Sequence, residues 1–562
     1  MESTKALLSI MVIGLAACQT TEPVQPPGAE VRAALGPVSA ESLERHVATM
    51  SDDSFGGRAP GTDGGLRTRA YLVSEMEKLG LEPLGDSFEH KVTLVSRTLD
   101  GAQSKARVDL GRRRFDELSY GPEAVFWTKR DDRRLSLQGS EMVFVGHGVV
   151  APEFGWDDYA GLDASGKTVV MLINDPGFRQ QGEDFGGNAM TYYGRWTYKF
   201  EEAARQGADA AIIIHQTEPA AYGWGVVEGS WTGPQLDLPR DEDATPPVVV
   251  EGWVTSEQAE ALFTSAGLNF AALEAAATKP GFKPVPMGNL KFTAELFQSL
   301  SSMESANVAG VLRGSERPDE YILYTAHWDH LGIDFDAVAR GEDGVYNGAV
   351  DNATGTGGIL AMAETWAKAG ITPKRSHLFL AVTAEESGLL GSKAFASNPP
   401  VPLKNIVGGI NVDAMLPLGR ASDVTVMGFG SSELEDILGD IAGLEEVRLT
   451  PDPEPQNGYF YRSDQLEFAK RGVPMLYVDN GLDLIEGGIE AGQAASAAYR
   501  AGPYHNISDE FDPDQWTFEG MVQAMTILRD VGVVLSEDES RPNWYVGNEF
   551  RAVRDAQLLQ DE

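Results

Sequence analysis

The pattern of hydrophobic and polar positions divides the chain into three stretches. From about 38 to 85, apolar residues recur at helical spacing, as in SAESLERHVATM and LRTRAYLVSEMEKLGLEPLG. From about 120 to 285, short β-type runs such as KTVVMLIND and DAAIIIHQ stand between Gly, Pro and Asp. From about 300 to 540, strand and helix patterns alternate, which predicts an α/β sheet with crossover helices. Its predicted strands are YILYTAHWD, SHLFLAVTAEE, NIVGGINVD and PMLYVDNG.

The first residues have the pattern of a bacterial lipoprotein signal. Leu7–Ala17 is an apolar run of 11 residues, too short to span a bilayer but suited to a signal-peptide core. It ends in LAAC, which resembles the lipobox where the signal is cut and the cysteine, Cys18, is lipidated. We therefore expect a signal peptide at 1–17 and a Pro-containing tether at 18–37. A plain secretory signal with an incidental cysteine is the alternative.

Composition excludes several classes of function. Asp and Glu number 84 against 45 Lys and Arg, a formal charge of −39, so a nucleic-acid partner is not expected. The single cysteine excludes an internal disulfide and a cysteine-based zinc finger. Any metal must therefore be held by His and carboxylates.

The segment GLDASGKT (161–168) has the letters of a phosphate-binding loop. That loop needs a strand before it and a helix after it, whose N-terminus meets the phosphates. Here TVVMLIND follows, which reads as a strand, and WDDYAG precedes, which does not. We therefore expect no nucleotide site at this segment.

Residues of metal-binding type gather at the predicted strand ends of the last stretch. In an open α/β sheet, ligands bind at the carboxyl ends of the strands. Three strand ends and two loops carry the candidates, which are His327, Asp329, Asp351, Glu385, Glu386, Asp413 and His505. Two imidazoles and three carboxylates suit a pair of Zn²⁺ ions about 3.5–4 Å apart, with a position left for water. In the pair Glu385-Glu386, one carboxylate can ligate while the other takes a proton.

These motifs resemble metallopeptidase family 28, the di-zinc aminopeptidases that also include glutamate carboxypeptidases and glutaminyl cyclases. The matching segments are AHWDHLG, NGAVDNATG, TAEESGLLGS, INVDAM, YRSDQLEFAKRGVP and YHNISDEFDP, with RAPGTDG earlier in the chain. The resemblance implies a mixed β-sheet with helices on both faces and an inserted β-rich protease-associated domain. The expected division is 38–118 and 289–540 for the peptidase domain, 119–288 for the insert and 541–562 for a peripheral tail.

The resemblance also implies a role for each candidate residue. His327, Asp351 and Asp413 would hold one zinc; Asp351, as the bridge, Glu386 and His505 would hold the other. Asp329 would fix the tautomer of His327, Glu385 would be the general base, Tyr504 would hydrogen-bond the developing oxyanion, and Arg462 would lie near the substrate, with Asp413 also beside it. Gln465 departs from the related motif, which often reads RSDH, so a pocket contact is expected to differ.

The expected activity is that of an aminopeptidase anchored through Cys18 in the bacterial envelope, on the periplasmic side of the outer membrane. Free carboxylate oxygens near the zinc ions suit a substrate ammonium, whereas a carboxypeptidase needs fixed cations. In the matched loops Arg462 is the plausible cation, since Lys393 and Lys404 lie away from the strand ends. Glutamate-carboxypeptidase-like or dipeptidase activity is the alternative. A one-zinc glutaminyl cyclase and a non-catalytic binding lipoprotein are the remaining hypotheses.

Overall fold

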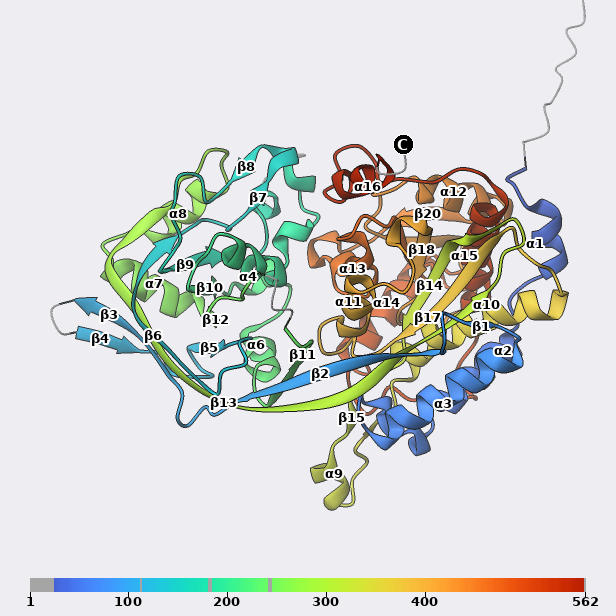
Figure 1. Ribbon diagram of the computed structural model, residues 1–562, viewed down its shortest axis with the longest axis horizontal. Helices are drawn as coiled ribbons and strands as arrows, with labels where there is room; N and C mark the ends of the chain where they lie inside the picture. Colours follow the sequence, from blue (N-terminus) through green and yellow to red (C-terminus); the bar gives the residue numbers. More distant parts are fainter. Residues whose placement is uncertain (1–24, 112–113, 180–183, 241–244, 560–562) are drawn as a thin grey trace, which may run out of the picture.

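The computed structural model describes residues 25–559, apart from 112–113, 180–183 and 241–244. The expected signal peptide and Cys18 lie outside the described residues. Among those that the structure describes, no helix is both long and apolar enough to cross a membrane. Two β-sheets, each covered by helices, form the two parts of the molecule (Figure 1).

The first sheet is mixed, and its central strands are parallel. In spatial order its strands are β2 (Glu89–Leu99), β13 (Val285–Leu312), β17 (Arg375–Val382), β14 (Arg317–His327), β18 (Ile406–Asn411), β21 (Met475–Asp479), β19 (Asp423–Met427) and β20 (Arg448–Pro451). The short strands β1 (Glu82–Pro83) and β11 (Pro234–Asp237) extend it beside β13 and β2. Every residue of β17 and β18 is buried, as expected for parallel strands covered on both faces.

Helices cover both faces of this sheet, so the predicted fold class is confirmed. Alternate residues of β14 enter different cores: Ile322 and Tyr324 face one layer, and Tyr321 and Leu323 face the other. The first layer consists of α2 (Ala40–Met50), α3 (Asp63–Lys78), α10 (Gly355–Ala369), α12 (Leu434–Leu444) and α15 (Glu519–Glu537). The second layer contains α11 (Leu390–Ser397) and α13 (Gln465–Ala469).

The second sheet is built mainly from residues 105–297. In spatial order its strands are β4 (Arg114–Glu117), β3 (Lys105–Gly111), the first half of β13, β6 (Arg134–Phe144), β9 (Lys167–Leu172), β10 (Ala210–Ile214), β12 (Val250–Val254) and β5 (Ala124–Trp127). On one face lie α7 (Ser256–Ser265) and α8 (Phe270–Ala277), and on the other α4 (Trp196–Arg205). The strand β9 begins at Lys167, inside GLDASGKT, so a strand and not a helix follows this loop, as predicted. The preceding segment WDDYAG was expected to contain no strand, but its first two residues form a short one, Trp156–Asp157.

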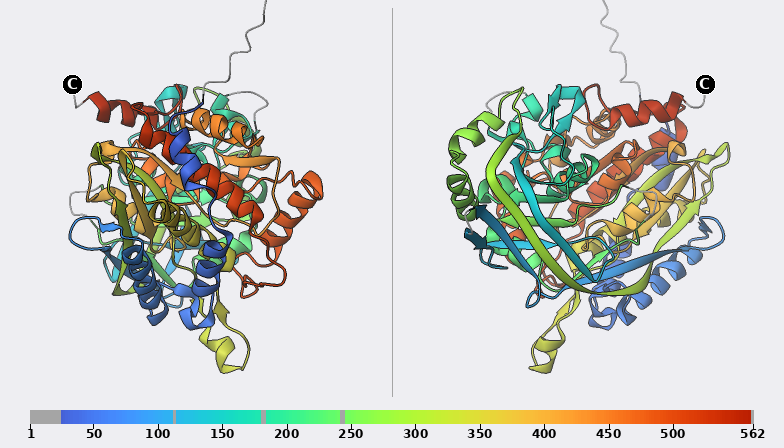
Figure 2. Two further views of the ribbon diagram at one scale, coloured as in Figure 1. Left: turned by 90° about the vertical axis from the view of Figure 1, so that its right-hand side faces the viewer. Right: turned by 60° about the vertical axis from the view of Figure 1, so that its left-hand side comes forward.

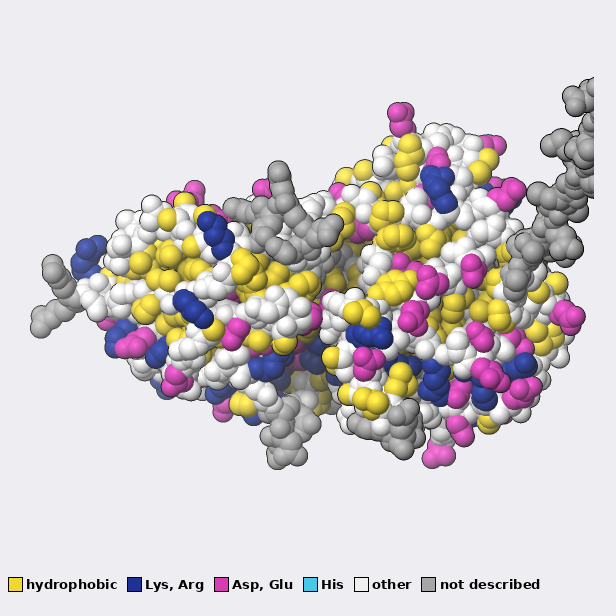
Figure 3. Space-filling model, turned by 90° about the horizontal axis from the view of Figure 1, so that it is seen from above, with side chains coloured by type: hydrophobic (Ala, Val, Ile, Leu, Met, Phe, Trp, Pro, Cys, Tyr) yellow, Lys and Arg dark blue, Asp and Glu magenta, His cyan; other side chains and the backbone are white. Residues whose placement is uncertain are grey.

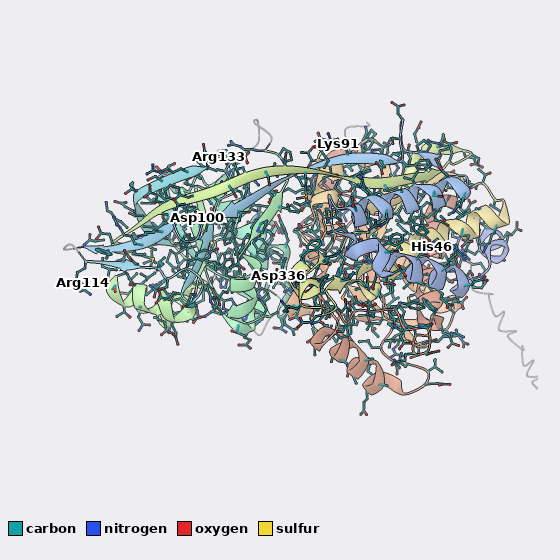
Figure 4. All side chains as sticks on the ribbon, turned by 90° about the horizontal axis from the view of Figure 1, so that it is seen from below. His46, Lys91, Asp100, Arg114, Arg133 and Asp336 are labelled. Atoms are coloured by element: carbon teal, nitrogen blue, oxygen red, sulfur yellow. The ribbon has the colours of Figure 1, made fainter. Side chains whose placement is uncertain are left out.

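One strand joins the two sheets. The strand β13 has 28 residues; its first half pairs with β3 and β6, and its second half pairs with β2 and β17. Figure 4 shows it running along both parts of the molecule. The expected domain boundaries are therefore corrected. The division between sheets falls inside β13 near residue 297 instead of at 288, and β3 and β4 belong to the second sheet although they precede 119.

Two terminal assignments are also corrected. The expected tether includes α1 (Ala29–Leu35), whose Leu35 packs with Trp366 and Val533. The expected peripheral tail enters the second core through Trp544 and Phe550, and it contains α16 (Arg551–Leu558). The helices α1 and α16 have only seven and eight residues, too few for a helical pattern of apolar positions to be recognised in the sequence. Packing against the rest of the protein makes both segments part of the fold.

Shorter elements complete the chain. Between β14 and α10, a hairpin of β15 (Gly332–Ile333), α9 (Phe335–Ala339) and β16 (Val345–Tyr346) projects from the first part of the molecule (Figures 1 and 2). The remaining elements are β7 (Val150–Ala151), β8 (Trp156–Asp157), α5 (Thr217–Ala220), α6 (Trp224–Ser230) and α14 (Gly488–Ala501).

Candidate metal centre

Three neighbouring parallel strands bring the candidate ligands to one edge of the first sheet. In the register of the sheet His327, the last residue of β14, pairs with Val382, the last residue of β17. The segment after β17 carries Glu385 and Glu386, and the segment after β18 carries Asp413. Parallel strands place their carboxyl ends at the same edge, which is where an open α/β sheet binds ligands.

The five predicted ligands form one cluster centred on Asp351. Nε2 of His327 lies 3.2 Å from Asp351 Oδ1 and 3.1 Å from Asp413 Oδ1. Nε2 of His505 lies 3.2 Å from Asp351 Oδ2 and 3.0 Å from Glu386 Oε2. The two oxygens of Asp351 thus face different imidazoles, as a carboxylate shared by two ions would.

The donor set and charges of this cluster suit divalent cations, and its nitrogen–oxygen distances of 3.0–3.2 Å are slightly shorter than those around a bound ion. Zinc ligands stand about 2.0–2.2 Å from the ion, so two donors on one tetrahedral ion are roughly 3.3–3.6 Å apart. Donor atoms of His327, Asp351 and Glu386 lie within 4.8 Å of one another. Burial lowers the pKa of His505, but the carboxylates of Glu386 and Asp351 outweigh it and raise that pKa to about 11. The cluster therefore holds more negative charge than its two imidazoles balance, and neutral nitrogen and carboxylate oxygen are donors that zinc accepts.

The predicted catalytic residues lie around this cluster. Glu385 is half-buried, and burial together with the neighbouring carboxylates of Glu386 and Asp413 raises its pKa well above the usual range. The ring of Tyr504 stacks on that of His505 with centroids 4.0 Å apart. Glu385 and Tyr504 both line the same cleft.

That cleft lies between the two parts of the molecule and has a volume of about 1840 Å³. Figure 3 shows the recess between them from above. Both parts contribute to its lining: the ligand cluster and Arg462 come from the first, and Trp127, Arg195 and Tyr222 from the second. The centre therefore faces a space that the inserted segment helps to shape.

Comparison with known proteins identifies the part of the chain that carries the cluster. Residues 307–528 match the model of Peptidase family M28. We refer to this part of the chain as the M28 domain. The resemblance inferred from the motifs is thereby confirmed, while the protease-associated character of the insert and the lipoprotein signal stay predictions.

Curated relatives of the M28 domain carry different names. The chain is similar to Aminopeptidase NAALADL1 of Rattus norvegicus, with 29% identity over 28% of this chain and 20% of that protein. A Probable zinc metalloprotease of Pyrenophora teres f. teres is 31% identical over 24% of this chain and 28% of that protein. The Glutamate carboxypeptidase 2 homolog of Caenorhabditis briggsae is 34% identical over 24% of this chain and 16% of that protein. The matched segments thus span less than a third of each relative.

The expected contact of Asp329 is corrected. Nδ1 of His327 lies 3.1 Å from the backbone carbonyl of Asp329 and 4.0 Å from its carboxylate. The carboxylate instead accepts from the backbone N–H of Glu385 at 3.2 Å. Asp329 therefore links the His327 strand end to the loop of the expected base.

Four residues that position the M28 ligands were not assigned a role from the sequence. Nδ1 of His330 lies 2.6 Å from Glu386 Oε1. Asp509 accepts from the backbone N–H of Val350 and of Asp351, both at 3.0 Å. His330 and Asp509 lie within the motifs AHWDHLG and YHNISDEFDP, which also contain the candidate ligands His327 and His505. This closeness in sequence could have pointed to a role beside the metal centre.

The other two are Arg58 and Ser463. Arg58, in the early RAPGTDG motif, is 1% exposed and donates to the carbonyls of Trp328, Asn347 and Gly348. Ser463 donates to Asp413 Oδ2 at 2.6 Å. No spacing in the sequence predicts either contact, because their partners lie 50 or more residues away.

The backbone at the centre is held in a costly conformation. Ala384, Ala414 and His505 have φ of 53°, 53° and 55°, in the left-handed region that L-residues rarely adopt. Ala384 precedes the Glu385-Glu386 pair, and Ala414 follows Asp413. Such residues collect at functional sites, where the surrounding structure maintains them.

Proposed function

We propose that the chain is a zinc-dependent exopeptidase that hydrolyses short peptides with two zinc ions. The observation that carries this proposal is the cluster of two imidazoles and three carboxylates around Asp351. His327, Asp351 and Asp413 would hold one ion, and Asp351, Glu386 and His505 the other. When bound, these ions would supply Lewis-acid activation of water and of the scissile carbonyl.

The remaining chemistry belongs to side chains of the chain itself. Glu385 takes the proton of the attacking water and passes it to the leaving amine. Its place directly before the candidate ligand Glu386, at the lining of the cleft, supports this role. Tyr504, stacked on His505, donates its hydroxyl to the carbonyl oxygen as negative charge develops there.

The end of the peptide that is recognised distinguishes two candidates. Aminopeptidase activity is the first, because Glu385 and Asp413 give the centre negative charge that attracts a substrate ammonium. Carboxypeptidase activity of the glutamate-carboxypeptidase kind is the second. The matched loops offer it Arg462, and Arg195 from the inserted segment lines the cleft as well. Two cations are therefore available to a substrate carboxylate.

The experiment measures metal content and end preference together. The purified protein should hold two zinc ions by mass spectrometry, lose activity on chelation and recover it with zinc. A single ion would point to a cyclase, and none to a binding lipoprotein. Acetylation of the substrate's amine should abolish cleavage by an aminopeptidase. Faster cleavage of the acetylated peptide would assign the carboxypeptidase reaction instead.

We further propose that Cys18 is lipidated and anchors the enzyme to the bacterial envelope, on the periplasmic side of the outer membrane. The support is the LAAC sequence after a short apolar run. Cys18→Ser should move the protein to the soluble extracytoplasmic fraction, or block processing of the signal, while leaving the zinc content unchanged. Membrane association of the variant equal to that of the wild type would contradict the anchor.

A further inference from the structure

Two arginines from different parts of the molecule meet in the cleft without an acidic partner. Arg195 immediately precedes α4 in the inserted segment, and Arg462 precedes α13 in the M28 domain. Both line the cleft that contains the ligand cluster. Among the described residues, no carboxylate lies within ion-pair distance of either guanidinium.

Their N–H groups are buried but unused. Nε of Arg195 and both Nε and Nη2 of Arg462 are shielded from solvent and have no hydrogen-bond partner in the described part of the chain. A buried guanidinium donor without an acceptor is costly, so native proteins normally satisfy it. A ligand with paired oxygens would supply the missing acceptors.

Aromatic rings support the pair. The guanidinium of Arg462 lies over the ring of Tyr459 at 5.6 Å and over that of Tyr222 at 5.8 Å. Burial and the nearby Arg462 lower the pKa of Arg195 to about 9. Two like charges held close together are stabilised when an anion binds between them.

Two other cations that line the cleft are already engaged. Arg97 pairs with Asp131 and Lys393 with Asp237 at the cleft wall. By contrast, the N-terminus of α4 beside Arg195 has no side-chain cap. Its free N–H groups and dipole add to the attraction for an anion at that point.

We propose that Arg195 and Arg462 form a subsite for a carboxylate of the peptide substrate. This inference rests on the proposed peptidase function and names the substrate class. Arg462 directly precedes Ser463, which hydrogen-bonds the candidate ligand Asp413. Both arginines and the ligand cluster line the same cleft. The favoured substrates are therefore short peptides with a free C-terminus, of which a dipeptide is the shortest.

The test compares Ala-Leu, its C-terminal amide and Ala-Glu amide with the zinc-loaded enzyme. We expect kcat/KM for Ala-Leu to exceed that for its amide at least 30-fold, mainly because KM is lower. At 1.36 kcal/mol per tenfold, this ratio corresponds to about 2 kcal/mol. Recovery of activity with Ala-Glu amide would assign the subsite to a side-chain carboxylate. If Ala-Glu amide is hydrolysed as slowly as the amide of Ala-Leu, the subsite binds the terminal carboxylate.

Two variants and a control link the preference to the arginines. Arg195→Met and Arg462→Met should each reduce the ratio of kcat/KM for the free acid to kcat/KM for the amide at least tenfold. Arg205→Met is the control, because Arg205 also lines the cleft but pairs with Glu202. Equal hydrolysis of acid and amide by the wild type, or an undiminished preference in both variants, would overturn the subsite. Hydrolysis of none of the three peptides by the wild type would instead refute the peptidase proposal.

Discussion

Replacing Ser463 with alanine isolates one contact that orients a candidate metal ligand. The hydroxyl of Ser463 donates to Asp413 Oδ2 at 2.6 Å, while Asp413 Oδ1 lies 3.1 Å from His327 Nε2. Ser463 also accepts from Nδ2 of Asn411 at 2.9 Å. The hydroxyl thus fixes the rotation of the carboxylate, so that one oxygen stays turned toward the imidazole.

The expected effect is on metal affinity more than on folding. A hydrogen bond to a charged group contributes about 1.5–3 kcal/mol, which corresponds to about 10–150-fold in affinity. Loss of a residue that orients a metal ligand typically costs 10–100-fold, so the two magnitudes agree. The second partner of Asn411, Gln465 Oε1 at 2.7 Å, remains in the variant. We therefore expect one zinc to bind 10–100-fold more weakly in a protein that stays folded.

The assay is a zinc titration against a competing chelator, with circular dichroism to check the fold. Ser432→Ala is the matched control, because Ser432 is also buried but its hydroxyl has no hydrogen-bond partner among the described residues. Ser463→Thr keeps the hydroxyl and should restore most of the affinity. Zinc affinity of Ser463→Ala within twofold of the wild type would refute the reasoning.

Three further predictions concern the base, the early arginine and acid stability. Glu385→Gln should lower kcat about 10²–10⁴-fold with both zinc ions retained, measured by steady-state kinetics and metal analysis; loss of zinc would show that Glu385 is a ligand. Arg58→Lys should leave at least one buried carbonyl unpaired, because an ammonium lacks the fixed fork of a guanidinium, and should lower the free energy of unfolding in urea by about 1–3 kcal/mol for each; unchanged stability would contradict this. Burial, aided by Arg45, lowers the pKa of His46 on α2 (Figure 4) to about 4, so the folded protein prefers the neutral ring. The free energy of unfolding therefore has its full value above pH 6.5 and falls by up to about 3 kcal/mol as the pH decreases toward 4. In urea titrations at several pH values, His46→Gln should flatten this dependence. An equal pH dependence in the variant would exclude His46 as its source.

The strand-end residues were predictable because each signal is local. Near-continuous apolar runs identify β14, β17 and β18 as buried strands, and the residue types that follow them are unusual for a core. Parallel pairing then brings His327, Glu386 and Asp413 to one edge without knowledge of any side-chain contact. The structure brings these residues together as the sequence predicts.

The shared strand and the supporting contacts could not be predicted in the same way. The two halves of β13 pair with different sheets, yet buried and partly buried positions alternate without interruption from Phe292 to Gln298, across the division near residue 297. The contacts of Arg58 depend on carbonyls 270 or more residues away. Hydrogen bonds to a carbonyl leave no trace in residue type, because every residue carries the same acceptor.

An ion cluster joins the two helices that follow Arg195 and Arg462. Lys470, directly after α13, lies 3.2 Å from Glu467 on α13 and 3.0 Å from Glu201 on α4. One lysine thus bridges acidic groups of the M28 domain and the inserted segment. This contact joins α13 to α4, and Arg462 and Arg195, which precede these helices, line the same cleft. The inserted segment therefore does more than cover the cleft: it supplies half of the cationic pair.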